Sequence, residues 1–170
     1  MDYQPMAARL ETERLLLEPM RLTDADRYVE LIVERGPGAR GHGTDVAAAR
    51  LKIAQMADGA AASGIGFLAL RRHGDTDMLG YCGLLVGRAS LDEPELAYEL
   101  LSREHGCGYA TEAARAMVEA AKATGRRRLW STVGDWNTAS LRVLDKLGFH
   151  RHHTAPGPQD SDLIYLTRSL

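Results

Sequence analysis

Hydrophobic and polar residues follow two different periods along the chain. Short apolar runs and alternating stretches, bounded by turn residues, predict strands near residues 14–18, 65–70, 78–86, 95–101, 129–133, 149–154 and 163–167. Apolar residues at three- and four-residue spacing predict helices over about 23–34, 45–61, 109–124 and 138–146. This order, one strand, two helices, three strands and then mixed elements, predicts a three-layer α/β fold.

Length and composition fit one globular domain spanning residues 1–170. The chain has 170 residues, 45% hydrophobic and 26% charged, with no internal repeat. We expect residues 1–9 to form a loose tail and residues 36–43, rich in glycine, to form a flexible loop.

Charge and cysteine content exclude several classes of function. The formal net charge of −2 gives no electrostatic reason to expect nucleic acid or an anionic membrane as a partner. The chain has no apolar run near the length of about 18 residues that spans a bilayer, and we expect no signal peptide. Two cysteines support neither a disulfide framework nor a metal cluster. We therefore expect a cytoplasmic protein without a metal.

The strand predicted at residues 95–101 leads into Gly106 and Gly108, which precede an alanine-rich helix. Glycine has no Cβ, so the backbone can approach a ligand closely. The first N–H groups of a helix lack intrahelical partners and lie at the positive end of the helix dipole. A strand, two glycines and a helix start in this order predict a loop that binds phosphate groups.

Two familiar phosphate-binding loops do not fit the residues. A P-loop needs Lys and then Ser or Thr directly after its last glycine, whereas Tyr109 and Ala110 follow here. A dinucleotide-binding loop needs an acidic residue at the end of the next strand, whereas residues 129–133 contain none and Asp135 comes late. The sequence thus argues against a kinase, an ATPase or a Rossmann dehydrogenase.

A third loop fits better. Residues 105–110 resemble Gln/Arg-x-x-Gly-x-Gly/Ala, the acetyl-CoA signature of the GNAT superfamily of N-acetyltransferases, with Gly108 and Ala110 at the fixed positions. His105 departs from the Gln, Arg or Trp that the family prefers there. Because such a loop binds mainly through its backbone N–H groups, one different side chain does not remove the resemblance.

Two more segments resemble the RimJ/RimL-type branch, which is known for acetylating the N-termini of ribosomal proteins. Residues 10–15 are similar to its opening ETERL motif. Asn137 and Ser140, followed by KLGF at residues 146–149, are similar to its closing motif. The three matches come in the right order and cover most of the chain.

This resemblance implies a fold and a cosubstrate. The expected fold is a central mixed, mostly antiparallel sheet of about seven strands flanked by about four helices. Acetyl-CoA would place its pyrophosphate on the glycine loop and its pantetheine arm along the strand at residues 95–101, where the family's sheet splays open. The residues expected to bind it are Leu100, Leu101, His105, Gly106, Cys107, Gly108, Tyr109, Ala110, Thr111, Asn137 and Ser140.

Acetyl transfer needs an uncharged amine and a partner for the leaving thiolate. The resemblance places an acid at Glu95, which we expect to accept the amine proton directly or through water. Glu99, on the same side of the strand, Asp135 and a water chain remain alternatives. The resemblance places Ser140 near the sulfur, where a hydroxyl would donate a hydrogen bond rather than act as a strong acid. A purely structural role as a first-turn residue is the alternative for Ser140.

The acceptor is the least determined part of this interpretation. A protein N-terminal amine and a small-molecule amine both fit, and a strongly acidic groove would favour a polycationic acceptor. A fold that binds acyl-CoA without transferring it, as a sensor or interaction module, is the alternative function. A homodimer is an expectation from the branch alone, because no periodicity in the chain identifies an interface.

Overall fold

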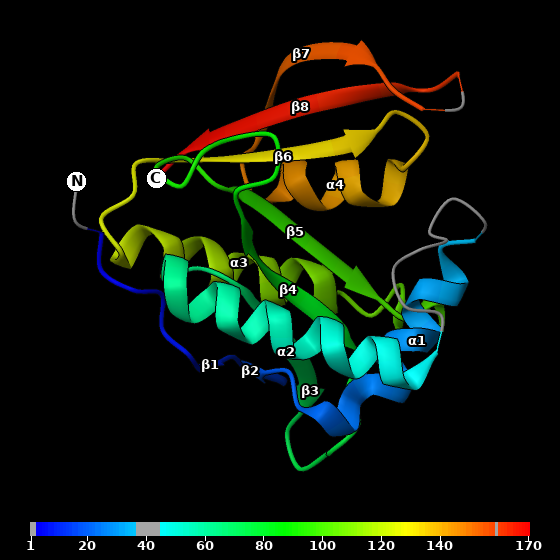
Figure 1. Cartoon of the computed structure of the whole chain (residues 1–170). Helices are drawn as coiled ribbons and strands as arrows, with labels where there is room; N and C mark the ends of the chain where they lie inside the picture. The colour runs from blue at the N-terminus through cyan, green and yellow to red at the C-terminus, as the bar shows by residue number, and fades with distance from the viewer. Residues whose placement is uncertain (1–2, 37–44, 159) are drawn as a thin grey trace.

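A computed structural model describes residues 3–36, 45–158 and 160–170 of the chain. In it, a single sheet is ordered β1-β2-β3-β4-β5-β6-β8-β7 (Figure 1). Its strands are β1 (Leu10–Glu11), β2 (Leu15–Pro19), β3 (Phe67–Arg72), β4 (Gly80–Leu85), β5 (Glu95–Leu100), β6 (Arg128–Gly134), β7 (His150–Pro156) and β8 (Asp162–Ser169). The α-helices are α1 (Ala25–Glu34), α2 (Val46–Ser63), α3 (Tyr109–Ala123) and α4 (Thr138–Lys146).

The predicted α/β fold is confirmed, with one additional strand. The described residues form an eight-stranded sheet rather than about seven strands, because Leu10 and Glu11 pair with Leu17 and Leu16 of β2. Every neighbouring pair is antiparallel except β5 and β6. Apart from Gly36, the loop expected at residues 36–43 lies outside the described residues.

The N-terminal segment differs from the loose tail that the sequence predicts. The Gln4 N–H donates to the Thr124 carbonyl at 3.1 Å, and the Met6 N–H donates to the Gly64 carbonyl at 2.8 Å. The guanidinium of Arg126 stacks on the Tyr3 ring, 4.5 Å from its centroid. These contacts hold residues 3–6 against the C-terminal ends of α2 and α3.

Helices cover both faces of the sheet and create two cores (Figure 1). Strand alternation divides β4 between them, because successive side chains point to opposite faces. Cys82 and Leu84 join α3 and α4 in one core, whereas Tyr81 joins α1 and α2 in the other. The three-layer arrangement predicted from the sequence follows from this division.

The sheet opens between β5 and β6. These parallel strands form one residue pair, Glu95 with Trp130, at their N-terminal ends. By contrast, β4 and β5 pair along the whole of β5. Figure 1 shows β5 and β6 diverging toward their C-terminal ends. The divergence exposes one backbone edge of β5, and α3 follows shortly after that strand ends.

Candidate functional site

Two glycines shape the loop that joins β5 to α3. Gly106 and Gly108 have φ angles of 77° and 81°, in the left-handed region that side chains disfavour. The first backbone bond of α3 runs from the Glu112 N–H to the Gly108 carbonyl, at 3.1 Å. The N–H groups of Tyr109, Ala110 and Thr111 therefore precede the helical ladder and have no intrahelical acceptor. With residues 105–108 exposed, this loop can present several N–H donors to an anion.

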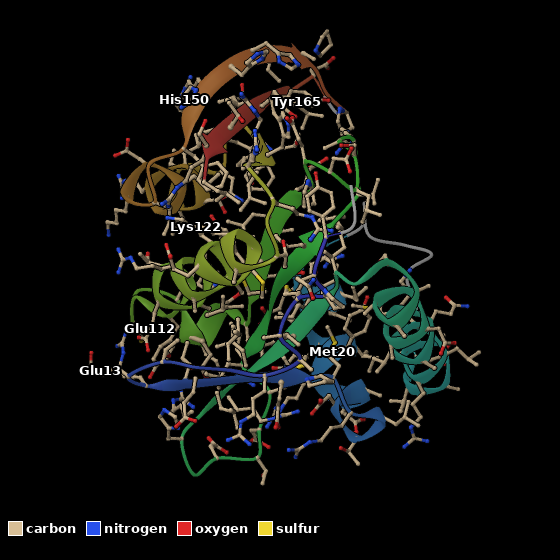
Figure 2. The ribbon with its side chains drawn as sticks, turned by 90° about the vertical axis from the view of Figure 1, so that its left-hand side faces the viewer. Glu13, Met20, Glu112, Lys122, His150 and Tyr165 are labelled. Carbon is tan, nitrogen blue, oxygen red and sulfur yellow. The ribbon has the colours of Figure 1, made fainter. Side chains whose placement is uncertain are left out.

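The opening motif of the chain clamps this loop. Arg14 donates from its backbone N–H and its Nε to the two carboxylate oxygens of Glu112, at 2.8 and 2.7 Å. Its Nη1 donates to the Cys107 carbonyl at 2.8 Å, and the guanidinium lies 4.7 Å from the centroid of the Tyr109 ring. Thr12 donates its hydroxyl to Glu112 at 2.6 Å. Figure 2 shows Glu112 beside the turn between β1 and β2 that carries Glu13.

The clamp also sets the charge of its carboxylate. Partial burial acts to raise the pKa of Glu112, but the hydrogen bonds from Thr12 and Arg14 outweigh burial and hold this pKa below its ordinary value. Glu112 therefore stays ionised at neutral pH and keeps Arg14 against the loop. Sequence analysis identified both segments as motifs but missed this contact, because the two residues are far apart in the chain.

The exposed edge of β5 faces the gap through alternate residues. The Trp130 N–H donates to the Pro94 carbonyl at 3.0 Å, and the Ser131 hydroxyl donates to the Leu96 carbonyl at 3.0 Å. Because backbone groups alternate in direction along a strand, Tyr98 and Leu100 also direct their N–H and C=O groups toward β6. The edge can thus pair with an extended ligand as a further strand would.

The two leucines predicted to bind the cosubstrate differ in whether their backbone groups face the gap. The Leu100 carbonyl accepts a hydrogen bond from His105 Nε2 at 2.9 Å, which folds the His105 ring back onto the strand. The Leu101 N–H donates to the Leu79 carbonyl at 2.9 Å, and its carbonyl accepts from Glu104 at 2.8 Å. Leu101 is fully buried, so its backbone does not face the gap as Leu100 does.

The start of α4 borders the other side of the gap. Asn137 is the N-cap residue, and its side-chain oxygen accepts the Ser140 N–H at 3.1 Å. The Ser140 carbonyl accepts the Tyr98 hydroxyl at 3.2 Å, which ties α4 to β5. Burial raises the pKa of Tyr98, so the phenol remains a neutral donor. The structure thus brings Ser140 close to β5, although these residues are separated in sequence by α3 and β6.

The three candidate proton acceptors have different surroundings. Glu95 is 6% exposed and accepts the Arg88 N–H through Oε1. Glu99 binds Arg35 through both carboxylate oxygens, at 2.7 and 2.8 Å from Nε, and accepts the Tyr81 hydroxyl at 2.7 Å. Asp135 is exposed beyond β6. Glu95 is therefore a buried carboxylate with no ion pair to the described side chains, whereas Glu99 is held in one.

A cavity of about 440 Å³ lies next to Glu95. It is formed by the β4–β5 loop and by β5, β6, β7 and β8. Its lining residues are Arg88, Ala89, Ser90, Glu93, Glu95, Trp130, Thr132, His153 and Tyr165. This cavity places open space beside the carboxylate that sequence analysis selected, but sequence analysis missed its walls.

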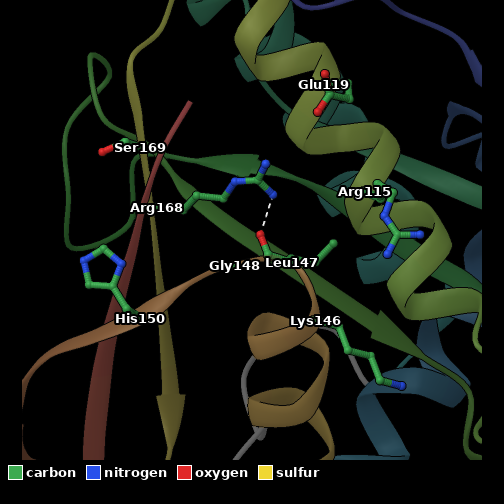
Figure 3. Close-up of a pocket in the computed structure, with 8 residues that line it drawn as sticks. All are labelled: Arg115, Glu119, Lys146, Leu147, Gly148, His150, Arg168 and Ser169. Carbon is green, nitrogen blue, oxygen red and sulfur yellow. Dashed lines mark hydrogen bonds between the residues drawn. The ribbon is translucent and has the colours of Figure 1, made fainter.

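A larger cavity of about 620 Å³ lies elsewhere, beside the outer side of α3 (Figure 3). Figure 3 shows Arg115 and Glu119 on α3 facing Arg168, which donates to the Leu147 carbonyl. None of the residues predicted for acetyl-CoA or catalysis lines this cavity. This cavity therefore does not mark the site predicted from the sequence.

Metal binding and membrane insertion can both be assessed for the residues that the structure describes. These residues contain no group of three or more His, Cys, Asp or Glu arranged to hold a metal ion. In the same part of the chain, every helix falls short of the length or apolar character needed to cross a membrane.

Comparison with known proteins identifies the family. The family model described as "Acetyltransferase (GNAT) domain" matches residues 14–150. A sequence comparison with curated proteins finds no match. Among solved structures, a putative GnaT-family acetyltransferase from Bordetella pertussis is 25% identical, with a TM-score of 0.79 over 95% of this chain and 99% of its own.

Two further structures are similar. An acetyltransferase from Agrobacterium tumefaciens str. C58 is 26% identical, with a TM-score of 0.76 over 95% of this chain and 94% of its own. Mycobacterium smegmatis RimJ, solved in complex with CoA-disulfide, has a TM-score of 0.80 over 98% of this chain and 90% of its own; its 17% identity supports the shared fold. The chain belongs to the GNAT acetyltransferases, enzymes that take an acetyl group from acetyl-CoA.

Proposed function

We propose that the protein transfers an acetyl group from acetyl-CoA to a primary amine by direct attack within a ternary complex. The observation that carries the proposal is the gap between β5 and β6. A loop of free helix N–H groups lies near its open end, and the buried carboxylate of Glu95 lies where the strands meet. One gap thus connects an anion-binding element with a candidate proton acceptor.

The loop and the strand edge suit acetyl-CoA. The N–H groups of residues 106–111 would hold its pyrophosphate, because a Cβ at Gly106 would have no heavy atom within 4 Å and the space beside it is open. The edge of β5 at Tyr98 and Leu100 would pair with the amides of the pantetheine arm. Asn137 and Ser140 border the arm from α4.

Acetyl-CoA supplies a thioester carbonyl, and the side chains around the gap would handle the protons. A C–N bond forms as the C–S bond breaks, and the amine loses a proton. Glu95 would receive that proton directly or through a water molecule in the adjoining cavity. Ser140 would donate a hydrogen bond to the leaving sulfur, which lowers the cost of the developing negative charge.

The test is to incubate the purified protein with acetyl-CoA and a panel of amines and N-terminal peptides. Released CoA should be separated by chromatography and the acetylated product identified by mass spectrometry. We expect one class of primary amine to release CoA in a one-to-one ratio with N-acetylated product. Acetyl-CoA binding without product from any amine would favour the sensor function instead.

A further inference from the structure

The cavity beside Glu95 has features that bear on the acceptor. It lies on the face of the sheet opposite α3 and α4. Strand alternation establishes this, because Leu129 and Val133 of β6 and Leu96 of β5 pack in the core with those helices. Trp130, Thr132 and Glu95 consequently project to the other face. An acceptor in this cavity would approach the gap without crossing the acetyl-CoA loop.

The walls of the cavity are aromatic with one buried hydroxyl. His153 and Tyr165 stack with ring centroids 4.2 Å apart, and Tyr165 pairs with Thr132 across β6 and β8. Thr132 Oγ1 is buried and has no hydrogen-bond partner among the described residues. A ligand with an apolar body would pack against the aromatic part of these walls.

Two of the charged side chains in the cavity lack an ion-pair partner among the described residues. Glu93 is compensated, because its Oε2 accepts Trp130 Nε1 at 2.9 Å and its Oε1 lies 3.4 Å from Nε of Arg128. Glu95 accepts a backbone N–H, and the ion pairs within residues 3–36, 45–158 and 160–170 include neither Glu95 nor Arg88. The cavity therefore offers one buried carboxylate and, on the exposed loop at its rim, one guanidinium.

We propose that the cavity takes a small amphoteric amine, one whose primary amino group lies within a few bonds of a carboxylate, as in an amino acid. This inference rests on the proposed function and names its acceptor class. The ammonium group would approach Glu95, the carboxylate would pair with Arg88, and the body would lie against Trp130 and Tyr165. A volume of about 440 Å³ suits such a molecule.

The same charges disfavour two other acceptors. A polyamine or aminoglycoside would bring several positive charges to one uncompensated carboxylate and would place some of them near Arg88. A protein N-terminus carries an amide where an amino acid has a carboxylate, so it would leave Arg88 without a partner. The cavity is therefore not the strongly acidic groove that a polycation requires.

Trp130 provides a binding signal that is independent of transfer. The chain has two tryptophans, and Trp136 is 71% exposed outside this cavity, so a Trp136→Phe protein reports Trp130 alone. In the presence of CoA, its fluorescence should be titrated with amino acids, their amides, the corresponding decarboxylated amines and spermidine. We expect at least one amino acid to bind saturably and about tenfold more tightly than its amide, its amine and spermidine.

Arg88→Gln should weaken the best amino acid about tenfold and leave its amide unchanged, whereas Arg127→Gln, on an exposed arginine outside the cavity, should change neither. Equal or tighter binding of amides or spermidine, or no titration by any amino acid, would overturn the inference. Turnover measurements distinguish this choice of acceptor from the proposed acetyl transfer. An amino acid that binds but is never acetylated would refute acetyl transfer and leave the binding inference intact. Acetylation restricted to amides would refute the amino acid as acceptor and leave acetyl transfer intact.

Discussion

At the scale of single residues, two glutamates on one strand show how surroundings decide a role. Glu95 and Glu99 share a face of β5, as the alternation of side chains along a strand predicts for residues four positions apart. Arg35 and Tyr81 hold Glu99, and burial raises the pKa of Tyr81, which keeps its hydroxyl a donor to that carboxylate. No local pattern could reveal this partnership, because Arg35 lies in a different part of the chain. We therefore keep Glu95 as the proposed proton acceptor.

Replacing Glu95 with Gln tests that role. The variant should lose about 100-fold in kcat near pH 7, because a positioned general base typically contributes a factor of about 10² to 10⁴. The deficit should shrink as pH rises, since more of the amine is then already neutral. The measurement is the pH–rate profile, with acetyl-CoA affinity expected to stay within about twofold.

Glu99→Gln is the matched control for this prediction. It removes one charge from the same strand face but sits in the Arg35 ion pair rather than in the cavity. We expect a lower melting temperature and an unchanged shape of the pH–rate profile. If the Glu95 and Glu99 variants exchanged these behaviours, Glu95 would not be the base.

At the scale of elements, two motifs that are distant in sequence, the opening motif and the glycine loop, meet in the structure. Helices 109–124 and 138–146 and most strands are predicted to within a few residues, because their periodicity is strong. The clamp of Arg14 and Glu112 is not predicted, because periodicity describes one element at a time. The two-residue strand β1 is also missed, being too short to show alternation.

The clamp gives the opening motif a testable positioning role. Arg14→Gln removes the bonds to Glu112 and Cys107 that hold the loop. Because these charge-assisted bonds hold the loop in shape, we expect the KM for acetyl-CoA to rise about tenfold, with kcat and the acceptor KM nearly unchanged. Steady-state kinetics with each substrate varied in turn measures this division.

Two variants sharpen the result. Arg9→Gln breaks a 3.8 Å pair with Glu11 that is exposed on both sides, and it should leave all constants unchanged. Arg14→Lys keeps the charge and should recover part of the acetyl-CoA affinity. A rise in both KM values together, or an unchanged acetyl-CoA KM in Arg14→Gln, would count against a role in shaping the loop.

At the scale of the whole molecule, a buried ion pair joins the N-terminal elements to the sheet. Arg71 of β3 is 1% exposed and donates to Glu18 at 2.9 Å, to Asp24 at 2.6 Å and to the Thr76 carbonyl at 2.7 Å. Sequence analysis predicted β3 but not a charge inside it, since an arginine at a strand end reads as exposed. The overall order of elements was predictable, whereas buried polar partners were not.

Arg71→Met should destabilise the fold by about 3–5 kcal/mol, because it leaves the buried carboxylate of Asp24 without its cation and leaves Glu18 with Arg21 alone. Arg27→Met removes a more exposed arginine that pairs with Glu30 and Asp77, and it should cost less than about 1 kcal/mol. Urea denaturation of both variants measures the difference. Equal losses in the free energy of unfolding would mean that the buried ion pair stabilises the fold no more than the exposed one does.

Calorimetric titration with acetyl-CoA tests the central claim most directly. The wild-type protein should bind in the micromolar range. Gly108→Val should abolish binding, because Gly108 has a φ of 81° and a Cβ there would lie 3.3 Å from Nη2 of Arg14. Gly125→Val carries the same strain, at φ 89°, beyond the other end of α3 and should bind as the wild type does. No binding by the wild type, or normal binding by Gly108→Val, would contradict the assignment of this loop.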